Sequence, residues 1–222
     1  FIALPLVIAG ILPLVGKISK KVLPDLLVNS VFIILLALVF FEGRSLVGQD
    51  PSILPLTWLG EPLNIRLMLD GFSLFMLFAV SLVGFAISLF SIDYMDHYGS
   101  KANLYALFLV MIAGMNGLLL VTDLFQIYIF LEVAAVASYA LVAFGLGHDE
   151  LEASFKYLML SAVASAFLLA GIVIIFGVTG GLDFETVSQG LRTLDARYLV
   201  GLCAAFFILG FGLKAALVPF HA

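Results

Sequence analysis

The chain has 222 residues and a formal net charge of −5; 64% of its residues are apolar and 11% are charged. Soluble domains are about half apolar, so this apolar fraction excludes an ordinary water-soluble domain. The mean hydropathy of +1.22 likewise indicates a membrane protein. The basic residues form no cluster suited to phosphates, which excludes nucleic acid as an expected partner. The only cysteine, Cys203, excludes an intrachain disulfide or a thiolate metal cluster.

Seven apolar runs follow one another along the chain, separated by breaks that are charged or rich in Gly and Pro. A membrane-spanning helix needs about 20 mainly apolar residues, and the runs lack the alternation of barrel strands, so each run predicts one helix. The expected fold is an all-α polytopic membrane protein. The first run lacks a preceding basic region and a following cleavage site, so a span is favoured over a removed signal peptide. The predicted spans are residues 1–16, 24–41, 71–92, 103–121, 124–146, 154–178 and 198–222.

Two long breaks lie between the spans. The first, residues 42–70, contains three prolines and then the alternating stretch Leu63–Leu69, which predicts a short extended segment outside the membrane. The second, residues 179–197, predicts a short interfacial helix over Asp183–Leu191.

The basic residues slightly favour one orientation. Five lysines are expected on the side that follows the first span and four arginines on the opposite side, which favours an N-terminus outside the cytoplasm. We divide the chain into residues 1–69, two spans with an extracytoplasmic loop, and residues 70–222, the third to seventh spans. The lysines are Lys17, Lys20, Lys21, Lys101 and Lys156.

Two charged residues lie well inside apolar runs, Glu132 in the fifth span and Lys214 in the seventh. A charge near the bilayer centre costs at least about 2.5 to 3.5 kcal/mol, and such residues usually face a water cavity, a bundle interior or one another. Glu132 and Lys214 therefore predict a proton relay. The alternative is a structural ion pair. An ion pair that separates during the transport cycle would serve both roles.

Three further residues accompany these charges. Tyr128 and Tyr139 share a helix face with Glu132 and either form bonds across helices or orient Glu132 and its water. Lys156, four residues after Glu152, is either an interfacial anchor or a further member of the relay.

The seventh span contains a proline close to its charged residue. Pro219 removes a backbone donor and clashes with the carbonyl of Ala215, which should kink or break the helix just beyond Lys214. Broken helices at membrane depth line a cavity or are buried in protein. His221 then follows as a titratable imidazole, either in the relay or at the interface beyond a simple kink.

Local signals predict helix ends and packing. Asp70 and Asp123 precede the third and fifth spans and are expected to cap those helices. Small residues spaced four apart predict close helix packing in the fifth and sixth spans. They are Ala134 with Ser138 and Ser161 with Ser165. The sequence has no phosphate loop, paired cysteines, His cluster or nucleophile motif, so no cofactor, metal or catalytic centre is expected in this chain.

Four stretches form a recognisable combination: Leu69-Asp70-Gly71-Phe72-Ser73-Leu74-Phe75, Leu131-Glu132, Phe155-Lys156-Tyr157, and Gly210-Phe211-Gly212-Leu213-Lys214-Ala215-Ala216-Leu217-Val218-Pro219-Phe220-His221. The combination resembles the antiporter-like subunits of complex I, of the Mrp sodium/proton antiporters and of the membrane-bound hydrogenases. The resemblance implies that Glu132 and Lys214 form a charge pair central to proton movement and that His221 continues the relay. It also implies about fourteen spans with two inverted repeats. The sequence stops before the eighth helix, so we expect the N-terminal half of such a subunit.

The resemblance implies a proton-translocating subunit of a multisubunit redox or antiporter complex, with sodium as the alternative ion. Its expected partners are other antiporter-like subunits and redox subunits, and its expected location is a prokaryotic cytoplasmic membrane. The main alternative is a structural subunit with a dry interior, in which Glu132 and Lys214 stay locked together. A free-standing transporter of an organic solute is the third interpretation.

Overall fold

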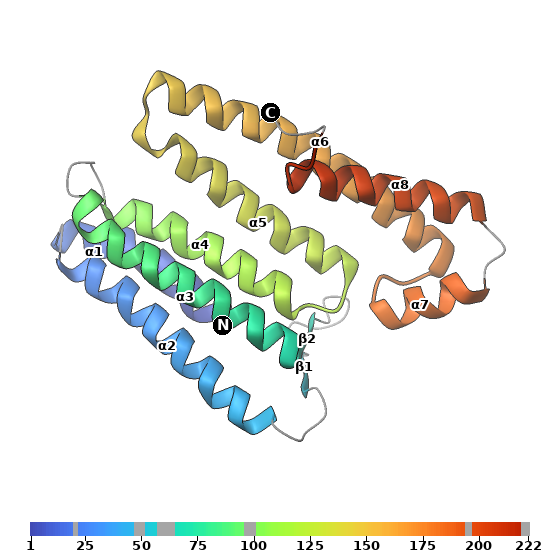
Figure 1. Cartoon of the computed structure of the whole chain (residues 1–222), viewed down its shortest axis with the longest axis horizontal. Helices are drawn as coiled ribbons and strands as arrows, with labels where there is room; N and C mark the ends of the chain where they lie inside the picture. Colours follow the sequence, from blue (N-terminus) through green and yellow to red (C-terminus); the bar gives the residue numbers. More distant parts are fainter. Residues whose placement is uncertain (20–21, 47–51, 57–64, 96–100, 194–196, 219–222) are drawn as a thin grey trace.

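The computed structural model describes residues 1–19, 22–46, 52–56, 65–95, 101–193 and 197–218. Within these ranges the chain is mainly helical, and Figure 1 shows its elements in chain order from blue to red. The helices are α1 (Ala3–Ile18), α2 (Val22–Leu46), α3 (Gly71–Tyr94), α4 (Lys101–Leu120), α5 (Leu124–Val142), η3 (Ala143–Gly145), α6 (His148–Thr179), α7 (Phe184–Thr193) and α8 (Arg197–Lys214).

Each predicted span corresponds to one helix, which confirms the all-helical membrane fold. The helices α2 to α6 are long and apolar enough to cross a membrane, and α1 and α8 are shorter apolar helices. With 32 residues at about 1.5 Å each, α6 is longer than the roughly 30 Å of hydrocarbon. Its charged first turns, which begin at His148, therefore extend beyond the hydrocarbon.

The two predicted caps are confirmed. The backbone N–H of Ser73 donates to Asp70 Oδ1 over 2.7 Å. The N–H groups of Phe125 and Gln126 donate to Asp123 Oδ1 over 2.8 and 3.1 Å. These carboxylates bind N–H groups that have no partner within the first helical turn, so they fix where α3 and α5 begin.

The connections at one end of the bundle are joined by backbone pairing. The predicted extended segment is present as β2 (Ile65–Leu69), which pairs antiparallel with β1 (Ser52–Leu56). Leu67 forms a bridge to Val121 between α4 and α5. The predicted short helix is present as α7, and Asp183 before it forms a bridge to Asp123.

The central helix is α4, which packs against α1, α3 and α5. Glycine permits a close approach of the α4 and α5 backbones, because a Cβ at Gly114 would lie 2.8 Å from the backbone nitrogen of Ala134 on α5. A second tight pairing joins α6 to α8, where a Cβ at Gly210 would lie 3.1 Å from the carbonyl of Ala164. In Figure 1, α5 lies between the α1–α4 group and the α6–α8 pair.

Candidate functional site

The structure brings together the two charges that the sequence places inside the membrane. Lys214 Nζ lies 2.7 Å from Glu132 Oε1. Glu132 comes from the middle of α5, and Lys214 is the last residue of α8. The Lys214 side chain is 11% exposed and the Glu132 side chain 30%, so the pair is largely removed from the surface.

Two serines of α6 complete the site. The hydroxyl of Ser165 donates to Glu132 Oε1, the oxygen that also accepts from Lys214. Lys214 Nζ also donates to Ser161 Oγ over 3.3 Å. Both serines are buried. Their spacing predicts packing, and their polar contacts could not be recognised from sequence because nothing there indicates which face of α6 points to Glu132.

The end of α8 explains how Lys214 reaches this position. The helix stops at Lys214, Ala216 has a left-handed φ of +49°, and the N–H of Leu217 donates back to the carbonyl of Gly212 over 2.9 Å. This arrangement closes the last turn of a helix. The carbonyl groups at a helix C-terminus favour a cation, so Lys214 lies at the favourable pole of α8. The break is where the sequence predicts it; Pro219 and His221 lie outside the described residues.

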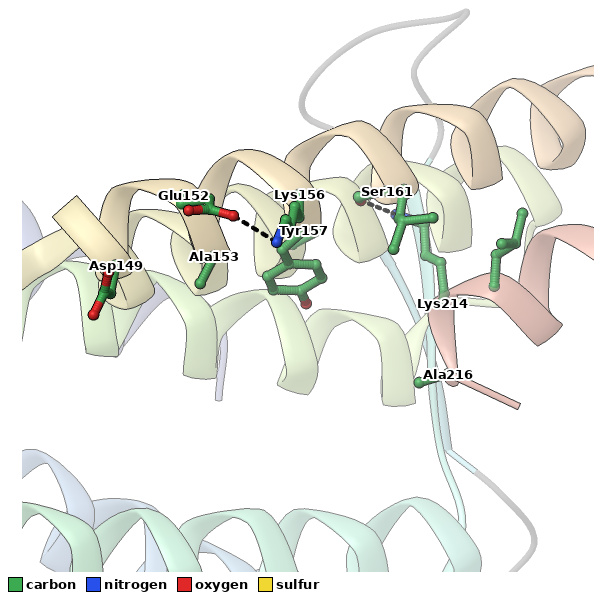
Figure 2. Close-up of a pocket in the computed structure, with 11 residues that line it drawn as sticks. Asp149, Glu152, Ala153, Lys156, Tyr157, Ser161, Lys214 and Ala216 are labelled. Atoms are coloured by element: carbon green, nitrogen blue, oxygen red, sulfur yellow. Dashed lines mark hydrogen bonds and ion pairs between the residues drawn. The ribbon is translucent and has the colours of Figure 1, made fainter. Parts of the chain in front are cut away.

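A cavity of about 470 Å³ lies beside Lys214. Figure 2 shows that it follows α6 from the charged first turns to Ser161 and the end of α8. Lys156 lines it and pairs with Glu152 over 2.7 Å, with 67% of the Lys156 side chain exposed. The pairing fits an interfacial anchor, while the position on the wall fits a relay member. The lining residues are Ala135, Asp149, Glu152, Ala153, Lys156, Tyr157, Leu160, Ser161, Leu213, Lys214 and Ala216.

The two tyrosines predicted near Glu132 contact aromatic rings. Tyr128 stacks on Phe125 with ring centroids 6.2 Å apart. Tyr139 meets Tyr157 edge to face, also at 6.2 Å. Tyr128 thus contacts a residue of its own helix, while Tyr139 contacts α6 at Tyr157, a residue of the cavity wall.

A second buried ion pair lies in the N-terminal half and was not predicted. Lys101 Nζ lies 2.9 Å from Asp25 Oδ2, and the two side chains are 4% and 15% exposed. Tyr105 donates to the other oxygen of Asp25 over 2.8 Å, and Lys101 donates to the carbonyl of Ile92 over 2.6 Å. Lys101 is the first residue of α4 and is enclosed by Asp25 of α2 and the end of α3.

Comparison with known proteins extends these observations. A family described as "NADH:quinone oxidoreductase/Mrp antiporter, TM" matches residues 121–222, and one described as "NADH-Ubiquinone oxidoreductase (complex I), chain 5 N-terminus" matches residues 58–105. NADH-quinone oxidoreductase subunit N of Desulforudis audaxviator is 28% identical over 222 residues, which cover 99% of this chain and 44% of that protein.

Two solved structures share the fold over nearly the whole chain. A chain of the membrane-bound sulfane sulfur reductase, an archaeal respiratory membrane complex, superposes with a TM-score of 0.88 and 25% identity, covering 99% of this chain and 45% of its own length. A chain of the Mrp complex from Dietzia sp. DQ12-45-1b has a TM-score of 0.85 and 28% identity, covering 100% and 41%. The present chain thus spans less than half the length of these relatives.

Proposed function

This chain belongs to the family of membrane subunits shared by NADH:quinone oxidoreductase and the Mrp antiporters, and on that premise we propose that it translocates protons within a multisubunit membrane complex. The observation that carries the proposal is the partly buried contact between Glu132 and Lys214. A charge inside a membrane is costly, so such residues usually belong to ion paths or proton relays.

The pair can act as a switch because each partner changes the free energy of ionising the other. The two charges lie 2.7 Å apart, and their attraction is stronger in a site from which water is largely excluded than in water. Protonation of Glu132 removes its attraction for Lys214, and a proton lost from Lys214 removes the same attraction. Either event frees the other group to exchange a proton with its surroundings.

The cavity beside Lys214 supports a path for such exchange. Lys156 lies on the wall of this cavity toward the charged end of α6, and Lys214 lies at its inner end. Protons are the proposed ion. A sodium ion would need oxygen ligands, and the carboxylate oxygen Glu132 Oε1 already binds the Lys214 ammonium. His221 is the proposed next member of the relay.

The relatives support the proposed partners. The solved relatives are chains of a respiratory membrane complex and of an Mrp complex, so other membrane subunits are the proposed partners here, with any redox centres on those subunits. A prokaryotic cytoplasmic membrane is the proposed location. The rival hypothesis is a structural subunit with a dry interior, in which Glu132 and Lys214 stay paired.

The test uses the full-length protein in its assembled complex, reconstituted into proteoliposomes. Glu132→Gln removes the charge, and Lys214→Arg keeps a cation that cannot release its proton. Proton transport should fall by about 100-fold or more in both, the range of a lost proton-transfer group. Glu185→Gln on α7 and Lys17→Ala at the end of α1 remove exposed charges and should leave transport unchanged. Assembled Glu132→Gln or Lys214→Arg complexes that transport at the normal rate would refute the proposal.

A further inference from the structure

Ser165 is placed between the ion pair and the backbone of its own helix. Its hydroxyl is within hydrogen-bond distance of Glu132 Oε1 and lies 2.8 Å from the carbonyl oxygen of Ser161. Ser165 is buried, with 7% of the residue exposed. Glu132 Oε1 is also the oxygen that accepts from Lys214 over 2.7 Å. Any change in the charge of Glu132 therefore acts directly on the hydrogen bond of Ser165.

A serine hydroxyl carries one proton and two lone pairs. The hydroxyl hydrogen of Ser165 can therefore point to Glu132 or to the Ser161 carbonyl. An ionised carboxylate only accepts, so it takes the proton of Ser165. A protonated Glu132 can instead donate to the Ser165 oxygen, while Ser165 donates to the Ser161 carbonyl. Ser165 keeps a hydrogen bond to Glu132 in both states, which differ by the proton on Glu132 and by a rotation of the Ser165 hydroxyl.

We infer that Ser165 is a positioning residue that gives Glu132 a hydrogen-bond partner in both of its protonation states. This inference rests on the proposed function of Glu132. A buried polar group without a partner is strongly disfavoured, so a site that must alternate between two states needs a partner suited to each. Ser165 meets this need, and Lys214 can leave Glu132 without exposing an unpaired carboxyl.

The chain offers a matched control on the neighbouring helix. Ser138 on α5 donates to the carbonyl of Ala134, four residues earlier, over 2.8 Å. Ser165 makes the same local bond to Ser161, also over 2.8 Å, and has the contact with Glu132 in addition. Comparing Ser165→Ala with Ser138→Ala thus separates the contact with Glu132 from the local effect of removing a helical serine.

The experiment measures proton transport against pH by the full-length protein in its assembled complex in proteoliposomes. Ser165→Ala should lower the rate by about tenfold, the effect of one lost hydrogen bond to a charged group. It should also move the pH profile upward by about one unit or less, because the lost bond is stronger to the charged carboxylate than to the neutral carboxyl. Ser138→Ala should reproduce the wild-type rate and profile.

The outcomes separate this inference from the proposed function. If Glu132→Gln abolishes transport while Ser165→Ala keeps the wild-type rate and profile, the inference about Ser165 is overturned and the proposed function stands. If Glu132→Gln transports normally, both fail. If the Ser165→Ala complex does not assemble, Ser165→Cys replaces it, because cysteine has a similar size and is a weaker hydrogen-bond donor. A lowered rate with a shifted pH profile in Ser165→Cys supports the inference. An unchanged pH profile in Ser165→Cys overturns it.

Discussion

Single residues at the site are held by groups from several elements. Lys214 contacts Glu132 of α5 and Ser161 of α6, and it lies at the carbonyl end of its own helix α8. These contacts compensate its charge locally, which lowers the cost of keeping a cation inside the membrane. They also make the charge of Lys214 sensitive to a proton gained or lost by its neighbours.

For Lys156, the substitution to arginine discriminates between the two interpretations. Arginine preserves the cation opposite Glu152 but does not release its proton. If Lys156 relays protons, Lys156→Arg and Lys156→Ala should both slow transport by about tenfold. This loss is smaller than the loss expected for a buried relay group, because water reaches the exposed Lys156 and can replace part of its role. Transport by reconstituted complexes is the measurement. Normal transport by Lys156→Arg would instead assign Lys156 to anchoring.

Asp183 makes stability at the start of α7 depend on pH. Its hydrogen bonds with Thr186, assisted by Arg66, hold the pKa of this carboxyl below its ordinary value of 3.8. A lowered pKa means that the stabilisation is fully present above about 3.8 and is lost as the pH falls through the lowered value.

We therefore expect Asp183→Ala to cost about 1 kcal/mol near neutral pH, the usual value of a helix cap. The difference from wild type should shrink below pH 3.8. Thermal unfolding in detergent across this pH range is the measurement. A difference that stays constant down to strongly acidic pH would contradict the role of the ionised carboxylate.

Among the elements, α2, α3 and α4 are tied together by buried charge. Asp25 of α2 pairs with Lys101 of α4, which also donates to the carbonyl of Ile92 on α3. Asn29, one turn after Asp25, accepts from Ser88 of α3 over 3.0 Å. Polar contacts of this kind specify which helix faces meet, since apolar packing alone is less selective in lipid.

A double-mutant comparison tests this tie. Asp25→Ala leaves Lys101 buried without its carboxylate and should cost about 3 to 5 kcal/mol of folding free energy. Asp25→Leu combined with Lys101→Met replaces the pair by apolar groups and should cost much less. The exposed pair offers the control, because Glu152→Ala should cause no measurable change. Denaturation in detergent measures all three, and an Asp25→Ala variant as stable as wild type would contradict the prediction.

For the whole molecule, the central question is what surrounds this helical unit. The chain spans less than half the length of its relatives, two of which are chains of multisubunit membrane complexes. We expect the protein to co-purify in mild detergent with other membrane subunits, because its solved relatives are chains of membrane complexes. Mass spectrometry of the purified material identifies those subunits. A protein that purifies alone would contradict the proposed complex.

The sequence by itself determined the helices, their caps and the two charges of the site. Each of these depends on local chemistry: long apolar runs require helices in lipid, Asp70 and Asp123 bind the N–H groups next to them, and a charge inside an apolar run is conspicuous wherever it packs. The break of α8 after Lys214 was also predictable, because Pro219 restricts the backbone close to it in sequence.

Only the tertiary structure decided which other side chains meet. The contact between Lys214 and Glu132, 82 residues apart, was expected from the family resemblance, whereas the contact between Lys101 and Asp25, 76 residues apart, was not. In a membrane, the faces that touch lipid and those that touch other helices are both apolar, so hydrophobic periodicity does not indicate how each helix is rotated. That rotation turns Ser161 and Ser165 toward the ion pair and Lys101 into the bundle, and so it determines which polar residues can act together.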